Sequence, residues 1–276
     1  MSDAADTLVL SRPQTRRRRT RAWSARTLAP VGVAIALIVL WALTIRVADI
    51  APTTFPNPAE VATAMFERAD DLFPATWITL QTMVVGFAIA AASGLVIALV
   101  IVLFRPVELT IYPLLVGSQV IPKIAIAPVI FIWFGLGSTS RIIVVVVLSF
   151  FPIVIAAVAG LRSLDRNAIH LARSVGASRW QLLVHFQLPQ ALPQIFSGLK
   201  LAATRAAGAA IVAEYITPGE GLGRTIFLAT SQLRPDIAMA GVAYLAVIGV
   251  GFYFLVAAAE RLAVPWHVSV RSRSGA

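Results

Sequence analysis

The stretch LRSLDRNAIHLARSVGASRWQLLVHFQLPQALP, from Leu161 to Pro193, is a long polar interruption in a strongly apolar chain of 276 residues. Its local signals predict two short helices joined by a turn. Asp165 is placed to cap the first helix, and Gly176 to end it, because glycine adopts the left-handed conformation without a Cβ penalty. Neither helix approaches the roughly 20 residues that cross a bilayer. The stretch therefore predicts a helix-turn-helix unit on the membrane surface, exposed to a soluble partner.

The second helix of this unit has its own boundary signals. Ser178 and Gln181 have the Ser-x-x-Gln spacing of a capping box, in which each side chain binds a free backbone amide of the other residue. Pro189 lacks a backbone donor, so we expect it to end the helix.

The composition of the chain places it in a lipid bilayer. Hydrophobic residues make up 58% and charged residues only 13% of the sequence, which is too apolar for an ordinary soluble domain. The formal net charge of +10 would suit nucleic-acid binding. However, the basic residues cluster beside apolar segments and lack interleaved aromatic side chains, so no nucleic-acid partner is expected. The absence of cysteine excludes disulfides and thiolate metal sites.

Six apolar segments are predicted to be transmembrane helices, which makes the fold class an all-α membrane protein. They cover about residues 28–45, 79–104, 107–134, 142–161, 195–216 and 237–259. The first segment follows a basic arm, as in a signal peptide, but it is longer than a signal core and no Ala-x-Ala site follows it. An uncleaved first helix is therefore favoured.

The distribution of basic residues predicts the topology. Fifteen of the 23 Lys and Arg residues lie on the side that holds the N-terminus, and five lie on the other side. The positive-inside rule then places both termini in the cytoplasm of a bacterial inner-membrane protein. Residues 1–27 are predicted to be a disordered arm, 28–263 a transmembrane domain that includes a cytoplasmic loop at 162–193, and 264–276 a cytoplasmic tail.

Several features within and between the spans predict local structure. The prolines of residues 107–134 predict a kinked or broken helix, a form that often lines pathways but also serves packing alone. The 3.6-residue period of Ala59–Arg68 predicts a short surface helix. The glycines of Gly219–Gly223 follow no strand, so they predict a turn and not a dinucleotide site.

Small residues recur at four-residue spacing on two of the spans, and such faces let transmembrane helices approach closely. This packing suits either contact within one subunit or a seam between two. The residues are Gly86, Ala90 and Gly94 on one span and Ala202, Ala206 and Ala210 on the other.

Three charged residues lie deep within the spans, where insertion of a central Lys or Arg costs roughly 2.5 to 3.5 kcal/mol. Arg205 and Glu214 are nine residues apart, about 13.5 Å of rise on opposite helix faces, so they do not pair. We expect Lys123 to be the partner of Glu214, and Lys200 to extend to the cytoplasmic interface. Lys123 and Arg205 are predicted to border a path for polar or anionic solutes, although a purely structural charge cluster is an equal alternative.

The polar stretch resembles the coupling loop, or EAA loop, of ABC-importer permeases, whose pattern is Glu-Ala-Ala, three residues, Gly, and later Leu-Pro. Ala172, Gly176, Leu188 and Pro189 match this pattern, whereas His170 and Leu171 depart from it. Further segments resemble the branch that carries nitrate, sulfonates, taurine and vitamin precursors. These segments are Ala177–Gln181, Leu188–Pro193, Ile121–Pro128, Trp133–Gly137, Ala213–Tyr215 and Gly221–Gly223.

The resemblance implies a type I ABC-importer permease fold and a set of partners. Two copies of the chain would form a homodimer that binds a cytoplasmic ABC ATPase dimer and an extracytoplasmic solute-binding protein.

ATP and Mg²⁺ would bind to that ATPase, because this chain has no P-loop sequence and needs no cofactor of its own, and its three histidines lack the neighbours of a metal site. The chain itself is therefore not expected to be an enzyme.

The resemblance also assigns candidate site residues. Lys123, Arg205 and Glu214 would belong to the translocation path or its gate. Leu182, Leu183 and Phe186 would pack against the membrane-facing base of the loop. The ATPase-coupling residues would be Asp165, His170, Leu171, Ala172, Gly176, Ala177, Ser178, Leu182, Phe186, Leu188 and Pro189.

The sequence leaves two questions open, namely the contact made at position 170 and the identity of the substrate. His170 stands where the family usually has glutamate, so either the partner ATPase differs at that contact or the contact is dispensable. The substrate is expected to be a small polar organic solute. Lys123 and Glu214-Tyr215 are more similar to permeases for pyrimidine or riboflavin-type vitamin precursors than to those for sulfonates.

Two other classes of function compete with this interpretation. A self-sufficient secondary carrier or channel would use the intramembrane charges to bind a coupling ion, but it predicts inverted repeats, which the sequence lacks. A membrane anchor would only recruit a cytoplasmic protein through the loop. A stable ATPase partner would argue against the carrier, and solute-dependent ATP hydrolysis would argue against the anchor.

Overall fold

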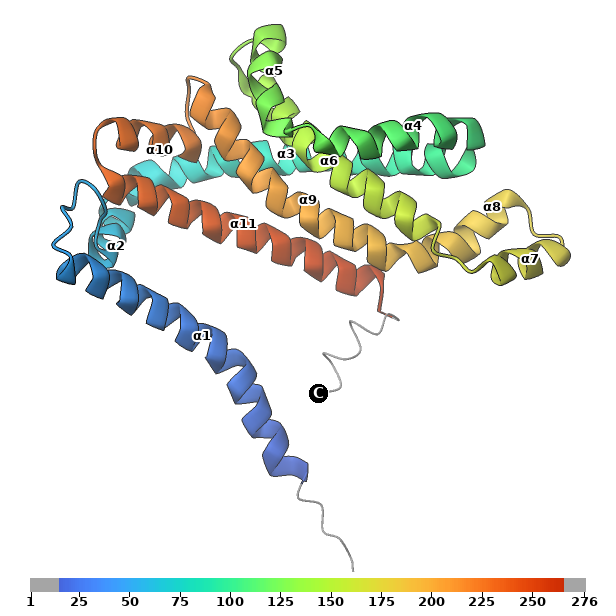
Figure 1. Ribbon diagram of the computed structural model, residues 1–276, viewed down its shortest axis with the longest axis horizontal. Helices are drawn as coiled ribbons and strands as arrows, with labels where there is room; N and C mark the ends of the chain where they lie inside the picture. Colours follow the sequence, from blue (N-terminus) through green and yellow to red (C-terminus); the bar gives the residue numbers. More distant parts are fainter. Residues whose placement is uncertain (1–14, 266–276) are drawn as a thin grey trace, which may run out of the picture.

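The computed structural model describes residues 15–265, with side chains from residue 31 onward, and every regular element within them is helical (Figure 1). This confirms the all-α class. The α-helices are α1 (Thr15–Val47), α2 (Pro58–Glu67), α3 (Ala69–Leu103), α4 (Arg105–Gly117), α5 (Ala127–Phe134), α6 (Ser138–Leu161), α7 (Arg166–Ser174), α8 (Arg179–Leu182), α9 (Leu188–Ile216), α10 (Leu222–Ser231) and α11 (Pro235–Ala263).

The long helices α3, α6, α9 and α11 form a bundle, and different short helices lie at its two ends (Figure 1). The short helices α2 and α10 lie at one end, and α7 and α8 lie at the other. The predicted surface helix at 59–68 is confirmed as α2, which begins with a capping box between Asn57 and Glu60. Helix α10 was not predicted.

Four described helices are long and apolar enough to cross a membrane, and a fifth candidate is a bent pair. The four are Ala69–Leu103, Ser138–Leu161, Arg179–Ile216 and Pro235–Ala263. The predicted first span corresponds to the shorter apolar run Val31–Val47. Of the six predicted spans, the described part of the chain thus contains four, or five if the bent pair counts as one span.

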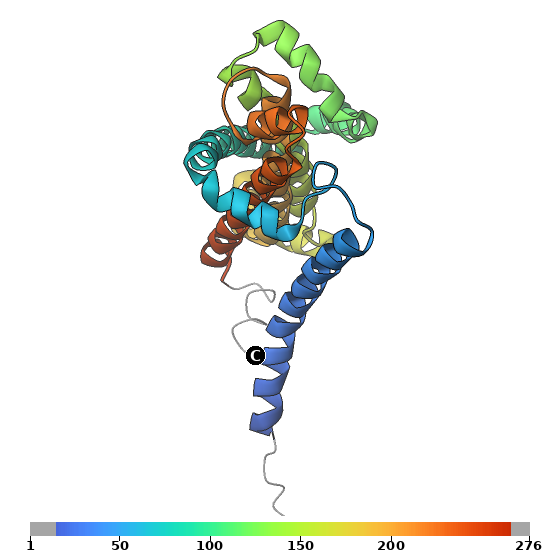
Figure 2. The same cartoon turned by 90° about the vertical axis from the view of Figure 1, so that its left-hand side faces the viewer.

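The first helix, α1, leaves the bundle near α2 and projects away from it (Figures 1 and 2). It is attached near its end, where the rings of Trp41 and Phe55 lie 5.6 Å apart and Ile45 is buried. Residues 15–27, for which we predicted disorder, belong to this helix. Residues 1–14 and the predicted tail from residue 266 onward lie outside the described residues.

The broken helix predicted at 107–134 is confirmed. Helix α4 passes through two short 3-10 turns, Ser118–Val120 and Lys123–Ile126, before α5, and the two halves meet at 94°. Pro122 lies between the turns with an extended ψ of 97°, where an α-helix cannot continue. Lys123 therefore lies at the bend between the two helical halves, beside the bundle and not within a straight span.

The small-residue faces make contacts within one subunit, which resolves the alternative left open by the sequence. A Cβ atom on Gly86 of α3 would lie 2.6 Å from the Cβ of Val145 on α6. Ala202, Ala206 and Ala210 of α9 are fully buried. These residues allow α3, α6 and α9 to pack with their backbones close together.

One boundary prediction is wrong, because Pro189 does not end a helix. It lies in the first turn of α9, and the chain is helical from α8 through a π-helical turn, Leu183–Gln187, into α9. In a regular α-helix the Pro189 ring would clash with the carbonyl of His185, four residues earlier. The wider π turn, in which the Leu188 N–H donates to the Leu183 carbonyl, accommodates the proline and keeps the helix continuous.

Replacement of Gly198 by alanine tests the packing of α9 on α6. The new Cβ would overlap the Cβ of Ala156 and lie 3.0 Å from the Pro152 carbonyl oxygen, so the two helices must separate. We expect Gly198→Ala to lower the free energy of unfolding by about 1 to 3 kcal/mol, as for other overpacked cores. Thermal denaturation of the purified chain in detergent would measure the loss.

Gly208→Ala is the matched control for this experiment. Gly208 lies on the same helix, but its Cβ would meet no atom within 4 Å, so the substitution should leave stability unchanged or raise it. Equal stability of the two variants would contradict close packing of α6 on α9.

Candidate functional site

The polar unit between α6 and α9 has the caps that the sequence predicts. The Asp165 carboxylate accepts the Asn167 N–H at 3.0 Å and begins α7. Gly176 follows α7 with a φ of +82°. The Ser178 N–H donates to the Gln181 side chain at 2.8 Å, and the Gln181 N–H donates to the Ser178 hydroxyl at 3.2 Å. The helix-turn-helix geometry is therefore confirmed up to Leu182.

The candidate coupling residues divide into a buried and an exposed group. Ala172 is only 3% exposed, and its carbonyl accepts the Ala177 N–H at 3.0 Å, so it packs inside the unit. His170, Gly176 and Ser178 are exposed. Leu171 is 69% exposed, although it is a large apolar side chain at a water-facing position.

Two further exposed apolar residues were missed by sequence reasoning. Val175 is 78% exposed and Trp180 is 64% exposed, on either side of the Gly176 turn. Together with Leu171 they are the exposed large apolar side chains of α7, α8 and the turn between them, a set that we call the α7–α8 patch. Their signal in the sequence was a bulky apolar residue at each flank of a predicted surface turn.

Three residues were predicted to pack at the membrane-facing base of the unit, and two of them are buried there. Leu182 and Leu183 are 6% and 2% exposed, and Leu183 joins a core with residues of α3 and α6. Phe186 is 44% exposed and does not belong to this core. Leu188 and Pro189 are partly buried at the start of α9, so they anchor the unit to a span and do not lie on its free surface.

Polar contacts fasten both ends of the unit to neighbouring helices. The Arg162 guanidinium, just after α6, forms an ion pair with Glu108 of α4 at 3.0 Å and lies 4.7 Å from the ring centre of Tyr112. The Gln190 side chain of α9 donates to the Ser163 carbonyl at 3.2 Å. These contacts tie the start of the unit to α4 at the end of α6 and to α9.

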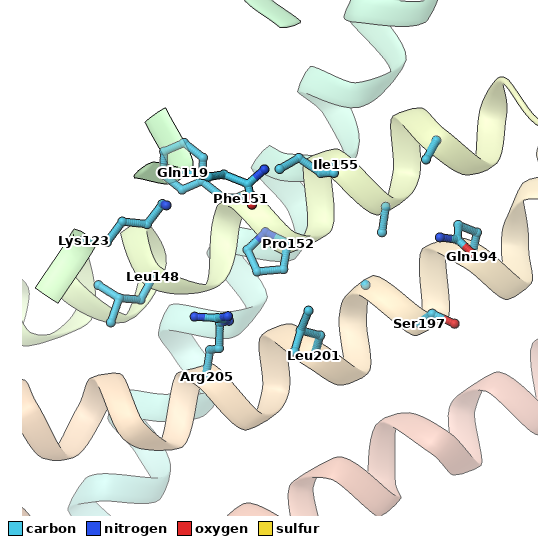
Figure 3. A pocket seen from close by; sticks show the side chains of 13 residues that line it. Gln119, Lys123, Leu148, Phe151, Pro152, Ile155, Gln194, Ser197, Leu201 and Arg205 are labelled. Atoms are coloured by element: carbon cyan, nitrogen blue, oxygen red, sulfur yellow. The ribbon is translucent and has the colours of Figure 1, made fainter. Parts of the chain in front are cut away.

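A cavity of about 370 Å³ lies on the face formed by α6, α9 and the break before α5 (Figure 3). Both Lys123 and Arg205 line this cavity, which brings together two residues that the sequence places on different spans. In Figure 3 the Arg205 guanidinium points from α9 towards the segment that carries Lys123. The Lys123 ammonium donates to the Ser118 carbonyl at 3.4 Å and lies 4.6 Å from the ring centre of Phe151.

Glu214 does not join these two cations, so its predicted pairing with Lys123 is wrong. It is buried near the far end of α9, where one carboxylate oxygen accepts the Thr79 hydroxyl at 2.8 Å and the Gly223 N–H at 3.0 Å. The carboxylate thus binds the first turn of α10, where free backbone N–H groups favour an anion. Lys123 lies at the bend between α4 and α5 and faces the cavity instead.

We call this group of contacts between α3, α9 and α10 the Glu214 latch. The Thr79 hydroxyl, besides binding Glu214, accepts the Leu222 N–H at 2.9 Å. The turn before α10 is equally constrained, because a Cβ on Gly221 would lie 2.5 Å from the Glu214 carboxylate and Gly221 has a φ of +129°. The turn predicted at 219–223 is confirmed up to Gly221, whereas Leu222 and Gly223 already belong to α10, and the glycines at 221 and 223 make room for the buried Glu214 side chain.

The isosteric substitution Thr79→Val tests the latch. It keeps the volume of the side chain but leaves the buried Leu222 N–H without an acceptor, which costs about 1 to 3 kcal/mol. Thr82→Val is the control, because Thr82 lies one turn further along α3, is also buried, and donates only to the Ile78 carbonyl. Thermal stability in detergent should fall for Thr79→Val and change little for Thr82→Val; an equal change in both would argue against the latch.

Comparison with known proteins identifies the family. Residues 86–265 match the family described as "Binding-protein-dependent transport system inner membrane component". This match covers the small-residue face of α3, the broken helix, the polar unit, the cavity and the α9 and α10 residues of the latch, whereas Thr79 lies just before it. It includes every candidate site residue named from the sequence.

The most informative relatives are permease proteins of two transport systems. The chain is 33% identical to the riboflavin transport system permease protein RibX of Chloroflexus aurantiacus, over 93% of this chain and 96% of the relative. It is 29% identical to the taurine transport system permease protein TauC of Escherichia coli, over 87% of this chain and 90% of the relative.

The fold is also found in solved structures. A crystal structure of an amino acid ABC transporter with histidines aligns with a TM-score of 0.60 at 20% identity, over 72% of this chain and 97% of the other. Both kinds of comparison agree with the helical architecture described above. The chain belongs to the family of binding-protein-dependent inner-membrane components, the permease subunits of ABC importers.

Proposed function

We propose that this permease subunit receives the motion of a cytoplasmic ATPase dimer through the α7–α8 patch and transmits it to a solute path beside the Lys123–Arg205 cavity. The observation that carries the proposal is the patch itself. Leu171, Val175 and Trp180 are mostly exposed on a unit that is otherwise polar and capped. Clustered apolar side chains in water are typical of a surface that docks a partner protein.

The position of the unit supports this role. It lies at the end of the bundle opposite α2 and α10 (Figure 1), between the ends of α6 and α9. The basic residues of this end favour a cytoplasmic location under the positive-inside rule, with both termini on the same side. A cytoplasmic ATPase would therefore reach the patch without entering the bilayer.

The buried position of Ala172 refines the role of the family motif. A small residue there lets α7 fold closely against its own turn, and the neighbouring exposed residues then meet the ATPase. His170 is exposed on α7 beside Leu171, so the contact that usually carries glutamate would here carry an imidazole. We propose that apolar contact at the patch replaces charge pairing as the main source of affinity.

The connections of the unit suggest how movement reaches the path. Helix α8 continues through the π turn into α9, which carries Arg205. Arg162 binds Glu108 on α4, and α4 leads to the break that carries Lys123. Rigid displacement of the unit would therefore shift both cations relative to α6, as expected for alternation between inward-facing and outward-facing states.

The complete importer that we propose contains two copies of this chain, each with six spans, two ATPase subunits and an external solute-binding protein. ATP and Mg²⁺ bind to the ATPase, where hydrolysis takes place. The solute is small, polar and organic, as the names of relatives for riboflavin and taurine transport suggest. A self-sufficient carrier is the alternative, and it would transport solute without an ATPase.

The double substitution Val175→Ser and Trp180→Ser tests docking at the patch. Removal of two exposed apolar anchors should weaken binding to the partner ATPase by about tenfold or more. Solute uptake should fall in parallel, while thermal stability stays close to that of the unaltered chain because neither side chain is buried. Titration of the ATPase onto the permease in lipid nanodiscs would measure the affinity.

The control for this test is Phe66→Ser, which removes an equally exposed aromatic residue from α2 at the opposite end of the bundle. It should leave ATPase binding unchanged. Undiminished ATPase binding by the double variant would contradict docking at the patch. Uptake that persists without any ATPase would instead support the self-sufficient carrier.

A further inference from the structure

We infer that the cavity between α6 and α9 is an anion-binding site on the permease itself, in which Lys123 and Arg205 bind the sulfonate, carboxylate or phosphate group of the solute. The inference rests on the proposed transport role and adds a chemical class of substrate to it. Its basis is the absence of a carboxylate beside these two cations, in contrast to Lys200, which lies on the same helix as Arg205 and is paired with Glu260.

The lining of the cavity carries positive charge and hydrogen-bond donors but no carboxylate. Besides Lys123 and Arg205, its polar side chains are Gln119, Gln194 and Ser197. Neither cation forms an ion pair with any residue in the described part of the chain. Two positive charges therefore face the same cavity without an opposing charge from the protein.

Two other cations near the spans are paired with carboxylates. Lys200, five residues before Arg205 on the same helix, pairs with Glu260 of α11 at 2.7 Å. Arg162 pairs with Glu108 at 3.0 Å. Because a charge within a span is costly unless it is paired or hydrated, the lack of a carboxylate at Arg205 points to an external anion or to water in the cavity.

A second copy of the chain would not supply the missing carboxylate at this depth. Glu214 is engaged in the latch, and Glu260 is engaged by Lys200. Helix α6 has no carboxylate, and those of α3, Asp70 and Asp71, lie in its first turn. The carboxylates that α3, α6, α9 and α11 offer within the bundle are thus either occupied or near a helix end.

The depth of Arg205 favours a solute over a lipid headgroup. Arg205 is 11 residues from the last residue of α9 and 17 from the first, or about 16 Å and 25 Å at 1.5 Å per residue. A headgroup phosphate at either surface of the membrane lies far from this position. A small solute that passes through the subunit would reach it.

The chemistry of the two cations suits an oxyanion. The planar guanidinium of Arg205 donates two parallel hydrogen bonds to a carboxylate, sulfonate or phosphate. The Lys123 ammonium supplies a second charge at the bend between α4 and α5, where the Phe151 ring covers one side of it. Such a site discriminates against solutes without an ionised oxyanion group, so it favours a solute with a sulfonate, carboxylate or phosphate group over unmodified riboflavin.

Binding of two isosteric probes to the purified full-length chain tests the inference. Ethanesulfonate carries a negative charge, and ethanesulfonamide has nearly the same shape without it. We expect equilibrium dialysis, with the chain in phosphatidylcholine nanodiscs and chloride as the only buffer anion, to detect ethanesulfonate binding and at least tenfold weaker binding of the sulfonamide. Equal affinity for the two probes, or no sulfonate binding, would overturn the inference.

Charge substitutions locate the site. Arg205→Gln and Lys123→Gln should each weaken ethanesulfonate binding by about tenfold or more, whereas Arg205→Lys should retain part of it. Lys200→Gln is the matched control, because Lys200 lies on the same helix but is already paired with Glu260. Size-exclusion profiles identify variants that fail to fold. Equal loss of binding in Lys200→Gln and Arg205→Gln would contradict the assignment.

Two further measurements separate the inference from its alternatives. Replacement of part of the phosphatidylcholine by phosphatidylglycerol should not displace ethanesulfonate; displacement would identify a lipid phosphate as the ligand and overturn the inference. ATPase binding is measured on the same samples. A chain that binds the ATPase but not ethanesulfonate contradicts only the anion site, and one that binds ethanesulfonate but no ATPase contradicts only the proposed coupling.

Discussion

Close packing of α6 against α3 and α9 is the constraint on which the rest of the structure depends. Lipid offers no hydrophobic drive for helices to associate, so contact comes from shape and from small residues. Gly86 admits Val145, and Gly198 admits Ala156. This packing fixes the face of α6 and α9 on which the cavity lies, and it fixes the ends between which the polar unit is held.

Charge in the bundle follows from this packing, because each buried ionisable group must find a partner on a neighbouring helix. Lys200 finds Glu260, and Glu214 finds Thr79 and the first turn of α10. These contacts use the carboxylates and leave Lys123 and Arg205 to the cavity. Lys200 and Glu214 of α9 thus have partners, whereas Arg205, which lies between them on the same helix, has no carboxylate partner in the described part of the chain.

The continuity of α8 with α9 links the surface unit to this site. A break at Pro189, as predicted from the sequence, would have separated the unit mechanically from the span. The π turn keeps one helical path from Trp180 to Arg205. The ion pair between Arg162 and Glu108 gives a second path, through α4, to the break at Lys123.

The sequence by itself determined the all-helical class, the family and the caps of the polar unit. Asp165, Gly176, Ser178 and Gln181 were predictable because each cap joins residues no more than a few positions apart. Only the tertiary structure decided which charges meet. Thr79 and Glu214 are 135 residues apart in the chain, and Lys200 and Glu260 are 60 apart. Such partners are set by helix packing and carry no local signal, so the pairing of Glu214 was predicted wrongly, and the shape and lining of the cavity that Lys123 and Arg205 share emerged only from the fold.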